Sequence, residues 1–481
     1  MDNVLLNSVR VWFIFIVILF STPYSWAMES LSDGETYIRK VEDHNITLSP
    51  QHLDLSKSID LSLKTNPELK SWEYEQKKSE NDKKIARSNF GPSLSLSLNH
   101  NDLISIDSKG PADTDYLDQN IDSLDMAVVQ PLFKGFTTIN EYNRAELLQN
   151  WTKWKIAYVK LGVVHEVQTN FLKLLQLMEE VNSLQQTVKR LENALEAAKS
   201  FHRVNMAPYI QVLEASVDLS DAKQRLSQAK SSLRTQTIKM NVLAGLSPDA
   251  PTVYEGELDT GLAEFPLSMS ECLAHAFLNR PDLLAAQVNQ HIAEKDIEII
   301  AGRYYPTVQL EGHYSIYDRD YDELGKDSLG SAYNRDQKNK YWAIVLNMRW
   351  NLFESGKTYY TQSKSRNEVS RQKELIRSLQ DQIKIEIRTY FLIMQESRGR
   401  IDSTRKAVTA AKENYQMARK RYQLQLAPNQ EVLNAQERLS RSEANLNQAL
   451  ADYKLSLANL YISMGIRNDS LLPTVSDTSN E

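Results

Sequence analysis

The chain has 481 residues, a net charge of −6 and 25% charged residues, but only 15 Gly and 14 Pro. This length accommodates two or three ordinary domains, and so few glycines and prolines leave few positions for tight turns. The acidic balance provides no basic surface, which argues against nucleic acid as a partner.

The first residues have the pattern of a secretory signal peptide. Arg10 precedes the apolar run Val11–Phe20, and a small-x-small motif ends at Ala27, after which cleavage is expected. An uncleaved anchor is the alternative, but about ten apolar residues are half of what a membrane-spanning helix needs. Because no later run approaches the ~18 apolar residues of such a helix, we expect export, or membrane entry by another route.

A tandem duplication covers most of the chain. The sequence NPEL at Asn66–Leu69 is matched by RPDL at Arg280–Leu283, 214 positions later. Further along the offset is 220, as between Ala207-Pro208 and Ala427-Pro428. Offsets that persist over several landmarks indicate two copies of one structural unit.

Each copy begins with a predicted helix, which is followed by two predicted strands. The helices cover about Leu55–Asn89 and Met269–Arg303, and a proline follows each of them. Residues 307–316 then alternate between apolar and polar positions, which is strand geometry. The polar positions are Gln309, Glu311 and His313. The next strand has an apolar residue at every second position: Trp342, Ile344, Leu346, Met348, Trp350 and Leu352.

After the strands, each copy has a stretch of about 70 residues without proline, which predicts a helix reaching ~105 Å. It ends at an Ala-Pro break, and a return helix is expected over Pro208–Gly245 and over Pro428–Gly465, since proline is favoured at helix starts. The second return helix has a heptad-like apolar stripe: Leu439, Leu446, Leu450, Tyr453, Leu457 and Leu460. Each break is therefore predicted to be the far turn of a helical hairpin, and a plain coiled coil without a pore is the alternative.

The four predicted strands of one chain are too few to close a barrel. Open strand edges cannot face lipid, because nothing there satisfies their backbone groups. Strands with one apolar and one polar face, and with Trp342 and Trp350 near the ends of the apolar band, suit lipid outside and water inside. Closure then requires several chains. A soluble sandwich is the alternative, but it does not explain why the strands are joined to helices of ~100 Å.

In this order, and duplicated, these motifs resemble the TolC family of outer membrane efflux proteins. The resemblance covers Leu53 to Ile466 and rests on the NPEL and RPDL helices, the strand starts GPSLSL and YPTVQL, the strand ends PLFKG and LFESG, and tips of the form A-P-x-x-x-V-L-x-A. It implies an α+β membrane protein: a homotrimer with a twelve-stranded transmembrane β-barrel, four strands per chain, and a tunnel of long α-helical hairpins. The implied location is the outer membrane of a Gram-negative cell, with the tunnel in the periplasm.

The resemblance also implies a division of the chain and a set of partners. The six parts are a signal peptide (1–27), an N-terminal periplasmic segment (28–52), repeat 1 (53–245), an equatorial linker (246–268), repeat 2 (269–465) and a flexible C-terminal tail (466–481). The implied function is a passive exit duct of a tripartite efflux pump or type I secretion system. Its partners would be a periplasmic adaptor (membrane fusion) protein, an inner-membrane transporter of ABC, RND or MFS type, and outer membrane lipid. The alternative is a periplasmic coiled-coil adaptor or scaffold, which has no reason to present an apolar strand face.

In the family the hairpin tips dock the adaptor. The matching residues here are Val204, Asn205, Met206, Ala207 and Pro208 in the first copy, and Leu424, Gln425, Leu426, Ala427 and Pro428 in the second. The family has a glycine at the positions of Asn205 and Gln425. The absence of these glycines changes the expected contact with the adaptor, but it does not change the prediction that the chain turns here.

The family also narrows its tunnel with acidic residues just after the second tip. The matching positions are Glu431 and Asn434, and the first copy has Gln211 and Glu214 in the same places. In a trimer Glu431 would occur three times around the axis, as a ring that favours cations or binds a divalent ion. A solvated carboxylate on a helix is the alternative.

The sequence does not support catalytic chemistry. The eight His residues are scattered, and Cys272 is the sole cysteine. There is no His-Glu-x-x-His, no Gly-rich phosphate loop and no Gly-x-Ser-x-Gly motif. We therefore expect no enzyme activity, no cofactor and no metal centre.

Overall fold

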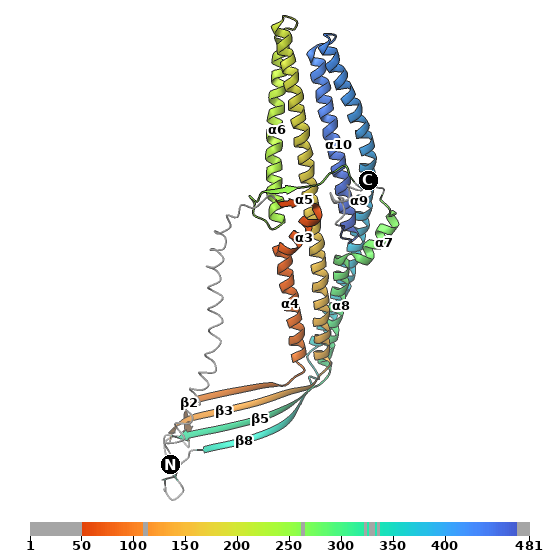
Figure 1. The fold of residues 1–481 in the computed structure, drawn as a ribbon. Coiled ribbons are helices and arrows are strands. Elements are labelled where there is room, and N and C mark those ends of the chain that lie inside the picture. The colour runs from red at the N-terminus through yellow and green to blue at the C-terminus, as the bar shows by residue number, and fades with distance from the viewer. Residues whose placement is uncertain are drawn as a thin grey trace. The chain divides into compact units, whose positions relative to one another are not determined.

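The computed structural model describes residues 51–108, 114–260, 265–321, 325–326, 332–333 and 337–468. The predicted signal peptide and most of the predicted N-terminal segment and tail lie outside the described residues. The chain forms two compact units. In the smaller unit the Gln51 amide donates to the Pro251 carbonyl at 3.2 Å, where β1 (Gln51–Leu53) pairs with β4 (Thr252–Tyr254). The larger unit, 53–249 with 254–481, holds the remaining elements (Figure 1).

The larger unit consists of two halves with the same order of elements. The first half contains α3 (Leu55–Thr65), α4 (Pro67–Ser88), β2 (Ser93–Ser108), β3 (Thr114–Lys134), α5 (Thr137–Arg203) and α6 (Ile210–Leu243). The second half contains α7 (Met269–Asn279), α8 (Pro281–Ala301), β5 (Thr307–Tyr321), β8 (Gln337–Arg349), α9 (Lys357–Gln423) and α10 (Asn429–Ser463). The second half also has the short elements η1 (Gly302–Tyr304), β6 (Gly325–Lys326) and β7 (Ala332–Tyr333).

The first predicted helix of each copy is in fact two helices. Asn66 and Arg280 have ψ angles of 121° and 115°, and the proline after each of them starts the next helix. Proline has no N–H to continue the preceding helix, and its ring forces the residue before it out of the helical region. The prediction of one continuous helix over Leu55–Asn89 and over Met269–Arg303 is therefore wrong at this point.

The return helix of each half ends at the joint between the first two helices of the same half. The Ser62 hydroxyl of α3 donates to the carbonyl of Leu243, the last residue of α6, at 2.5 Å. In the second half the Arg280 guanidinium donates to the Ser463 carbonyl, at the end of α10, at 3.4 Å. Thus α4 continues beyond the end of α6 and α8 continues beyond the end of α10, whereas α7 lies to the side, next to α9 (Figure 1).

The two longest helices, α5 and α9, each have 67 residues. At ~1.5 Å per residue each reaches about 100 Å, as predicted. Both begin at a pair of residues with left-handed backbone, which are Gly135 and Phe136 in the first half and Ser355 and Gly356 in the second. We call α5 with α6 the first hairpin and α9 with α10 the second hairpin. None of the described helices is both long and apolar enough to cross a membrane.

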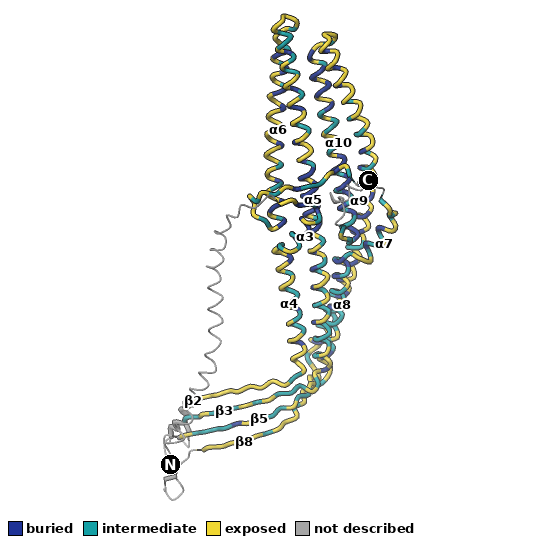
Figure 2. The backbone as a smooth tube through the Cα atoms, viewed as in Figure 1, coloured by how far each residue is buried: buried dark blue, intermediate teal, exposed yellow. Residues whose placement is uncertain are grey.

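The main core lies where α3, α7 and the inner ends of α6 and α10 meet the middle of α5 and α9 (Figure 2). Ile59, Phe171, Ile383 and Ile387 are fully buried there. The predicted apolar stripe of α10 is confirmed. Its buried members are Leu439, Leu450, Tyr453 and Leu460, and its half-buried members are Leu446 and Leu457.

The linker between the halves is held to the second hairpin by two cations. Lys454 of α10 is 1% exposed, and its ammonium donates to the Thr260 carbonyl at 2.7 Å. Burial lowers the pKa of Lys454 to about 8, although the charge of Asp259 works in the opposite direction. Arg405 of α9 pairs with Asp259.

The sheet has the order β2-β3-β5-β8, and all neighbouring strands are antiparallel. Its register places the apolar positions of all four strands on one face: Leu94, Leu96, Leu98, Leu124, Met126, Val128, Val308, Leu310, Tyr314, Ile316, Trp342, Ile344, Leu346 and Met348. The opposite face carries the polar positions. Within the described chain β2 and β8 each pair with one strand only and form the two edges of the sheet (Figure 1).

Candidate functional site

Backbone hydrogen bonds close each hairpin tip at the end of its outgoing helix. The Met206 amide donates to the Phe201 carbonyl at 2.8 Å, and the Asn205 amide donates to the His202 carbonyl at 2.9 Å. The second hairpin repeats both bonds at 2.8 and 2.9 Å, 220 positions later. This helix end, the Schellman motif, places one residue in the left-handed region. That residue is Asn205 in the first hairpin (φ 57°) and Gln425 in the second (φ 61°), at the positions where the sequence departs from glycine.

We expect Gln425→Gly to stabilise the second tip by about 1 kcal/mol, because glycine adopts positive φ without the steric cost that glutamine carries. Hydrogen exchange of the Leu426 amide, which donates across the turn, measures this local stability. The control is Gln416→Gly, which places glycine at an exposed position inside α9 and should instead destabilise the helix by about 0.5–1 kcal/mol. Equal exchange in the glycine variant and the parent would show that the left-handed residue carries no strain.

The structure brings the two predicted docking segments together. The Phe201 and Tyr422 rings meet edge to face at a centroid distance of 5.3 Å, and the Gln425 amide donates to the Met206 sulfur at 3.3 Å. Both tips border one cavity of about 360 Å³. It is lined by Phe201, Met206, Ala207, Gln211, Tyr422, Gln425, Leu426, Ala427 and Pro428. The four apolar side chains nearest the turns, Val204, Met206, Leu424 and Leu426, are 59 to 70% exposed.

The residues predicted to form the gate that narrows the tunnel, Glu431, Asn434, Gln211 and Glu214, do not all line one cavity within the chain. Arg421 donates to Glu431 at 2.6 Å, so this carboxylate already has a cationic partner. Asn434 accepts from Gln430 at 3.1 Å and lines a groove between the hairpins, whereas Gln211 lines the tip cavity. Sequence reasoning missed the role of Arg421, although two opposite charges flanking the predicted turn were a signal for it.

The groove between the hairpins has a volume of about 970 Å³ and is formed by α5, α6 and α10. Burial raises the pKa of Asp218 there, and the nearby charges of Asp221, Glu437 and Glu214 add to the effect. Arg190 of α5 pairs with Glu443 of α10 at 3.1 Å and ties the two hairpins together. Among the described residues, no three or more His, Cys, Asp or Glu side chains form a group that could hold a metal ion.

The predicted polar residues of β5 form a network centred on Glu311. Gln309 donates to one oxygen of this carboxylate at 2.5 Å, and His313 Nε2 lies 3.0 Å from the other. Asn347 of β8 donates to Glu311 at 3.2 Å. Sequence reasoning missed Asn347, although it occupies a polar position of the predicted strand.

The predicted lipid-facing residues Trp342, Ile344, Leu346 and Met348 share the apolar face of the sheet and are 60 to 74% exposed. The prediction that this strand continues through Trp350 to Leu352 is wrong, because β8 ends at Arg349. Its partner β5 begins only at Thr307, after a proline that has no N–H to donate. The Trp350 indole instead donates to the Tyr304 carbonyl at 3.0 Å.

The fold is similar to several solved channel structures. For VceC from Vibrio cholerae the TM-score is 0.70 at 18% identity, and the match covers 85% of this chain and 96% of that chain. For CusC the TM-score is 0.72 at 13% identity, and the match covers 88% of this chain and 96% of CusC. For the CmeC outer membrane channel of Campylobacter jejuni the TM-score is 0.71 at 17% identity, and the match covers 89% of each chain. At these identities the likeness concerns the fold alone.

The sequence matches one family model in two segments, residues 58–246 and 273–466, which correspond to the two halves of the structure. The description of that model is outer membrane efflux protein. No curated protein matches the chain. The two segments cover most of the 481 residues. The chain therefore belongs to the outer membrane efflux protein family, whose members are channels of the outer membrane and not enzymes.

Proposed function

We propose that three copies of this chain close a twelve-stranded barrel in the outer membrane and continue it as a helical tunnel into the periplasm. The observation that carries this proposal is a four-stranded sheet with one apolar face and two edges, β2 and β8. Unpaired edge groups cannot remain in lipid, so the edges of neighbouring copies must pair. The apolar face then contacts lipid, and the Glu311 network lines the water-filled interior.

The duct is passive and receives its cargo from an inner-membrane transporter through a periplasmic adaptor. Two features support the docking of an adaptor at the tips: the exposed apolar side chains beside each turn and the cavity that both tips border. Exposed apolar groups around a cavity are typical of a protein contact surface. Both a tripartite efflux pump and a type I secretion system use such a duct.

Membrane fractionation and mass determination test this proposal. The protein should resist extraction by carbonate, should enter detergent as a trimer, and should form channels in planar lipid bilayers. Extraction by carbonate or salt alone would favour the periplasmic adaptor or scaffold. A stable monomer without channel activity would overturn the barrel.

We expect Glu431→Ala to raise the single-channel conductance or to reduce the preference for cations, if three copies of this carboxylate ring the tunnel. Arg421→Ala should have the opposite effect on selectivity, because it removes the cation that pairs with Glu431 at 2.6 Å. Ion selectivity in planar bilayers measures both variants against the parent. If neither variant changes the electrical behaviour, Glu431 does not belong to the gate.

A further inference from the structure

The two halves repeat each other down to the hydrogen-bond register of their strands. β2 and β3 pair with Ser93 opposite Val129. β5 and β8 pair with Thr307 opposite Arg349. The first members of these pairs are 214 positions apart and the second members 220, which are the offsets of the sequence duplication. A residue before the strand loop therefore has its counterpart 214 positions later, and a residue after the loop has its counterpart 220 positions later.

Away from the hairpin tips, most of the contact between the halves uses one set of counterpart surfaces. α5 packs against α8 and α10, and β3 pairs with β5. The counterparts of these five elements are α9, α4, α6, β8 and β2. In the described part of the chain the extensive helix contacts of α9 are with α7, α8 and α10 of its own half, and β2 and β8 are sheet edges. The second set of surfaces is thus left for another copy.

An ion pair between the halves has a counterpart whose two charges are kept but do not pair within the described chain. Arg144 of α5 donates to Asp296 of α8 at 2.6 Å. The counterpart of Arg144 is Lys364 on α9, and the counterpart of Asp296 is Asp82 on α4. Within the described residues the side chains of Lys364 and Asp82 form no salt bridge or hydrogen bond, although the charge of Lys78 is near Asp82, and Lys364 is exposed.

An apolar contact between the hairpins also has a counterpart that is not formed within one chain. Leu433 of α10 is 5% exposed and packs against four residues of the first hairpin: Val188, Leu191, Leu219 and Ala222. Its counterpart, Leu213 of α6, is 45% exposed. The counterparts of the four contact residues are again small or apolar: Val408, Ala411, Leu439 and Ser442. Leu439 is already buried within its own chain, so the half-buried Val408, Ala411 and Ser442 are the residues left on the second hairpin to contact Leu213 of another copy.

The strand edges also have a register that the repeat specifies. Val128 of β3 stands opposite Gly312 of β5. Their counterparts are Met348 of β8 and Leu98 of β2, which are both apolar and exposed. This register keeps the apolar face continuous from one copy to the next, whereas a shift by one residue would set polar against apolar positions.

We propose that neighbouring copies meet through the same contacts that join the two halves of one chain. Asp82 of one copy then pairs with Lys364 of the next, Leu213 fits against the next copy's second hairpin, and Leu98 stands opposite Met348. This inference rests on the proposed closed ring of copies and adds the residues that form it. The Asp82 and Lys364 charges, the exposed Leu213 and the register of Leu98 with Met348 all indicate the same partner, a second copy of this chain.

Cross-linking between separate chains tests the proposal. In a full-length Cys272→Ala background, one tagged chain carries Asp82→Cys and a differently tagged chain carries Lys364→Cys. After co-production and treatment with a short thiol cross-linker, we expect a covalent dimer with both tags. The matched control is Arg144→Cys with Asp296→Cys, which should react only when both lie in one chain. An oligomer of unchanged mass that yields no mixed dimer overturns the proposal and leaves the barrel standing, whereas a monomer overturns both.

Charge reversal provides a second readout. Asp82→Lys and Lys364→Glu should each lower the temperature at which the oligomer dissociates in detergent, because like charges then face each other. The double variant should restore most of the loss, and a double variant that is no better than the singles contradicts the ion pair. In the sheet, Leu98→Cys should form a disulfide between copies with Met348→Cys but not with Asn347→Cys, whose side chain lies on the opposite face. Equal reaction of both pairs contradicts the register.

Discussion

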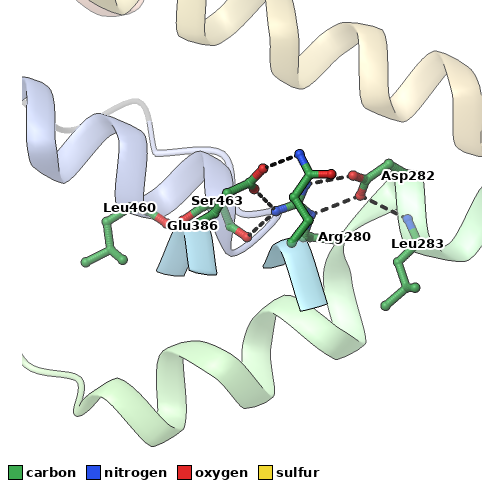
Figure 3. Close-up of polar contacts among 7 residues, drawn as sticks. Arg280, Asp282, Leu283, Glu386, Leu460 and Ser463 are labelled. Carbon is green, nitrogen blue, oxygen red and sulfur yellow. Dashed lines mark hydrogen bonds and ion pairs between the residues drawn. The ribbon is translucent and has the colours of Figure 1, made fainter. Parts of the chain in front are cut away.

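Replacing Arg280 with methionine is expected to lower the free energy of unfolding by about 3 kcal/mol per chain. The side chain is 11% exposed, and it pairs with Asp282 at 2.7 Å and with Glu386 at 2.5 Å (Figure 3). Burial works against the charge, but the hydrogen bonds to Asp282 and Glu386 outweigh it and raise the pKa of Arg280 above its ordinary value. Methionine makes none of these bonds and leaves two carboxylates without their cation where α8, α9 and α10 meet.

Two control variants separate the effect of the Arg280 ion pairs from helix capping and from the loss of an exposed ion pair. Arg280→Asn introduces the residue found at the matching position of the first half, where the Asn66 side chain accepts from the Leu69 amide at 3.0 Å and caps α4. It should recover about 1 kcal/mol through capping of α8. Lys78→Met removes an exposed ion pair and should leave the stability almost unchanged. Thermal unfolding followed by circular dichroism compares them, and an Arg280→Met protein as stable as Lys78→Met would contradict the assigned role.

Replacing the glycine at either end-to-end helix joint with alanine is expected to destabilise the protein by about 2–4 kcal/mol, from left-handed strain together with overpacking. Gly245 has a φ of 72°, and a Cβ there would lie 2.3 Å from the Thr65 hydroxyl oxygen. Gly465 has a φ of 74°, and a Cβ there would lie 2.8 Å from the Arg280 amide nitrogen. Both neighbours belong to the joint between two helices, because Thr65 is the last residue of α3 and Arg280 lies between α7 and α8.

A helical glycine in open space provides the control for these variants. Gly399 in α9 has no atom within 4 Å of an added Cβ, so Gly399→Ala should stabilise the protein by about 0.5–1 kcal/mol. Adding Thr65→Ala to Gly245→Ala removes the close contacts with the Thr65 hydroxyl oxygen and methyl group, but it keeps the Thr65 Cβ at 2.4 Å and the strained φ, and should recover only part of the loss. Denaturant unfolding measures all four proteins. Equal effects of alanine at positions 245 and 399 would rule out the joint as the cause.

Sequence reasoning worked well wherever the signal was local or repeated. Alternation over residues 307–316 predicted β5, and the absence of proline predicted the 67 residues of α5 and of α9. It failed at Asn66 and Arg280, where the motif that revealed the duplication also contains the proline that splits the helix. The effect of that proline on its neighbour was readable from the sequence and was overlooked.

By itself the sequence determined the duplication, the two hairpins, the two-faced strands and the resemblance to the family. These features depend on periodicity and on turn-forming residues, which act over a few positions of the chain. Only the tertiary structure decided which helix continues which and which charges meet. The bonds from Ser62 to Leu243 and from Arg280 to Ser463 span 181 and 183 positions, and such contacts form only once packing has brought distant helix ends together.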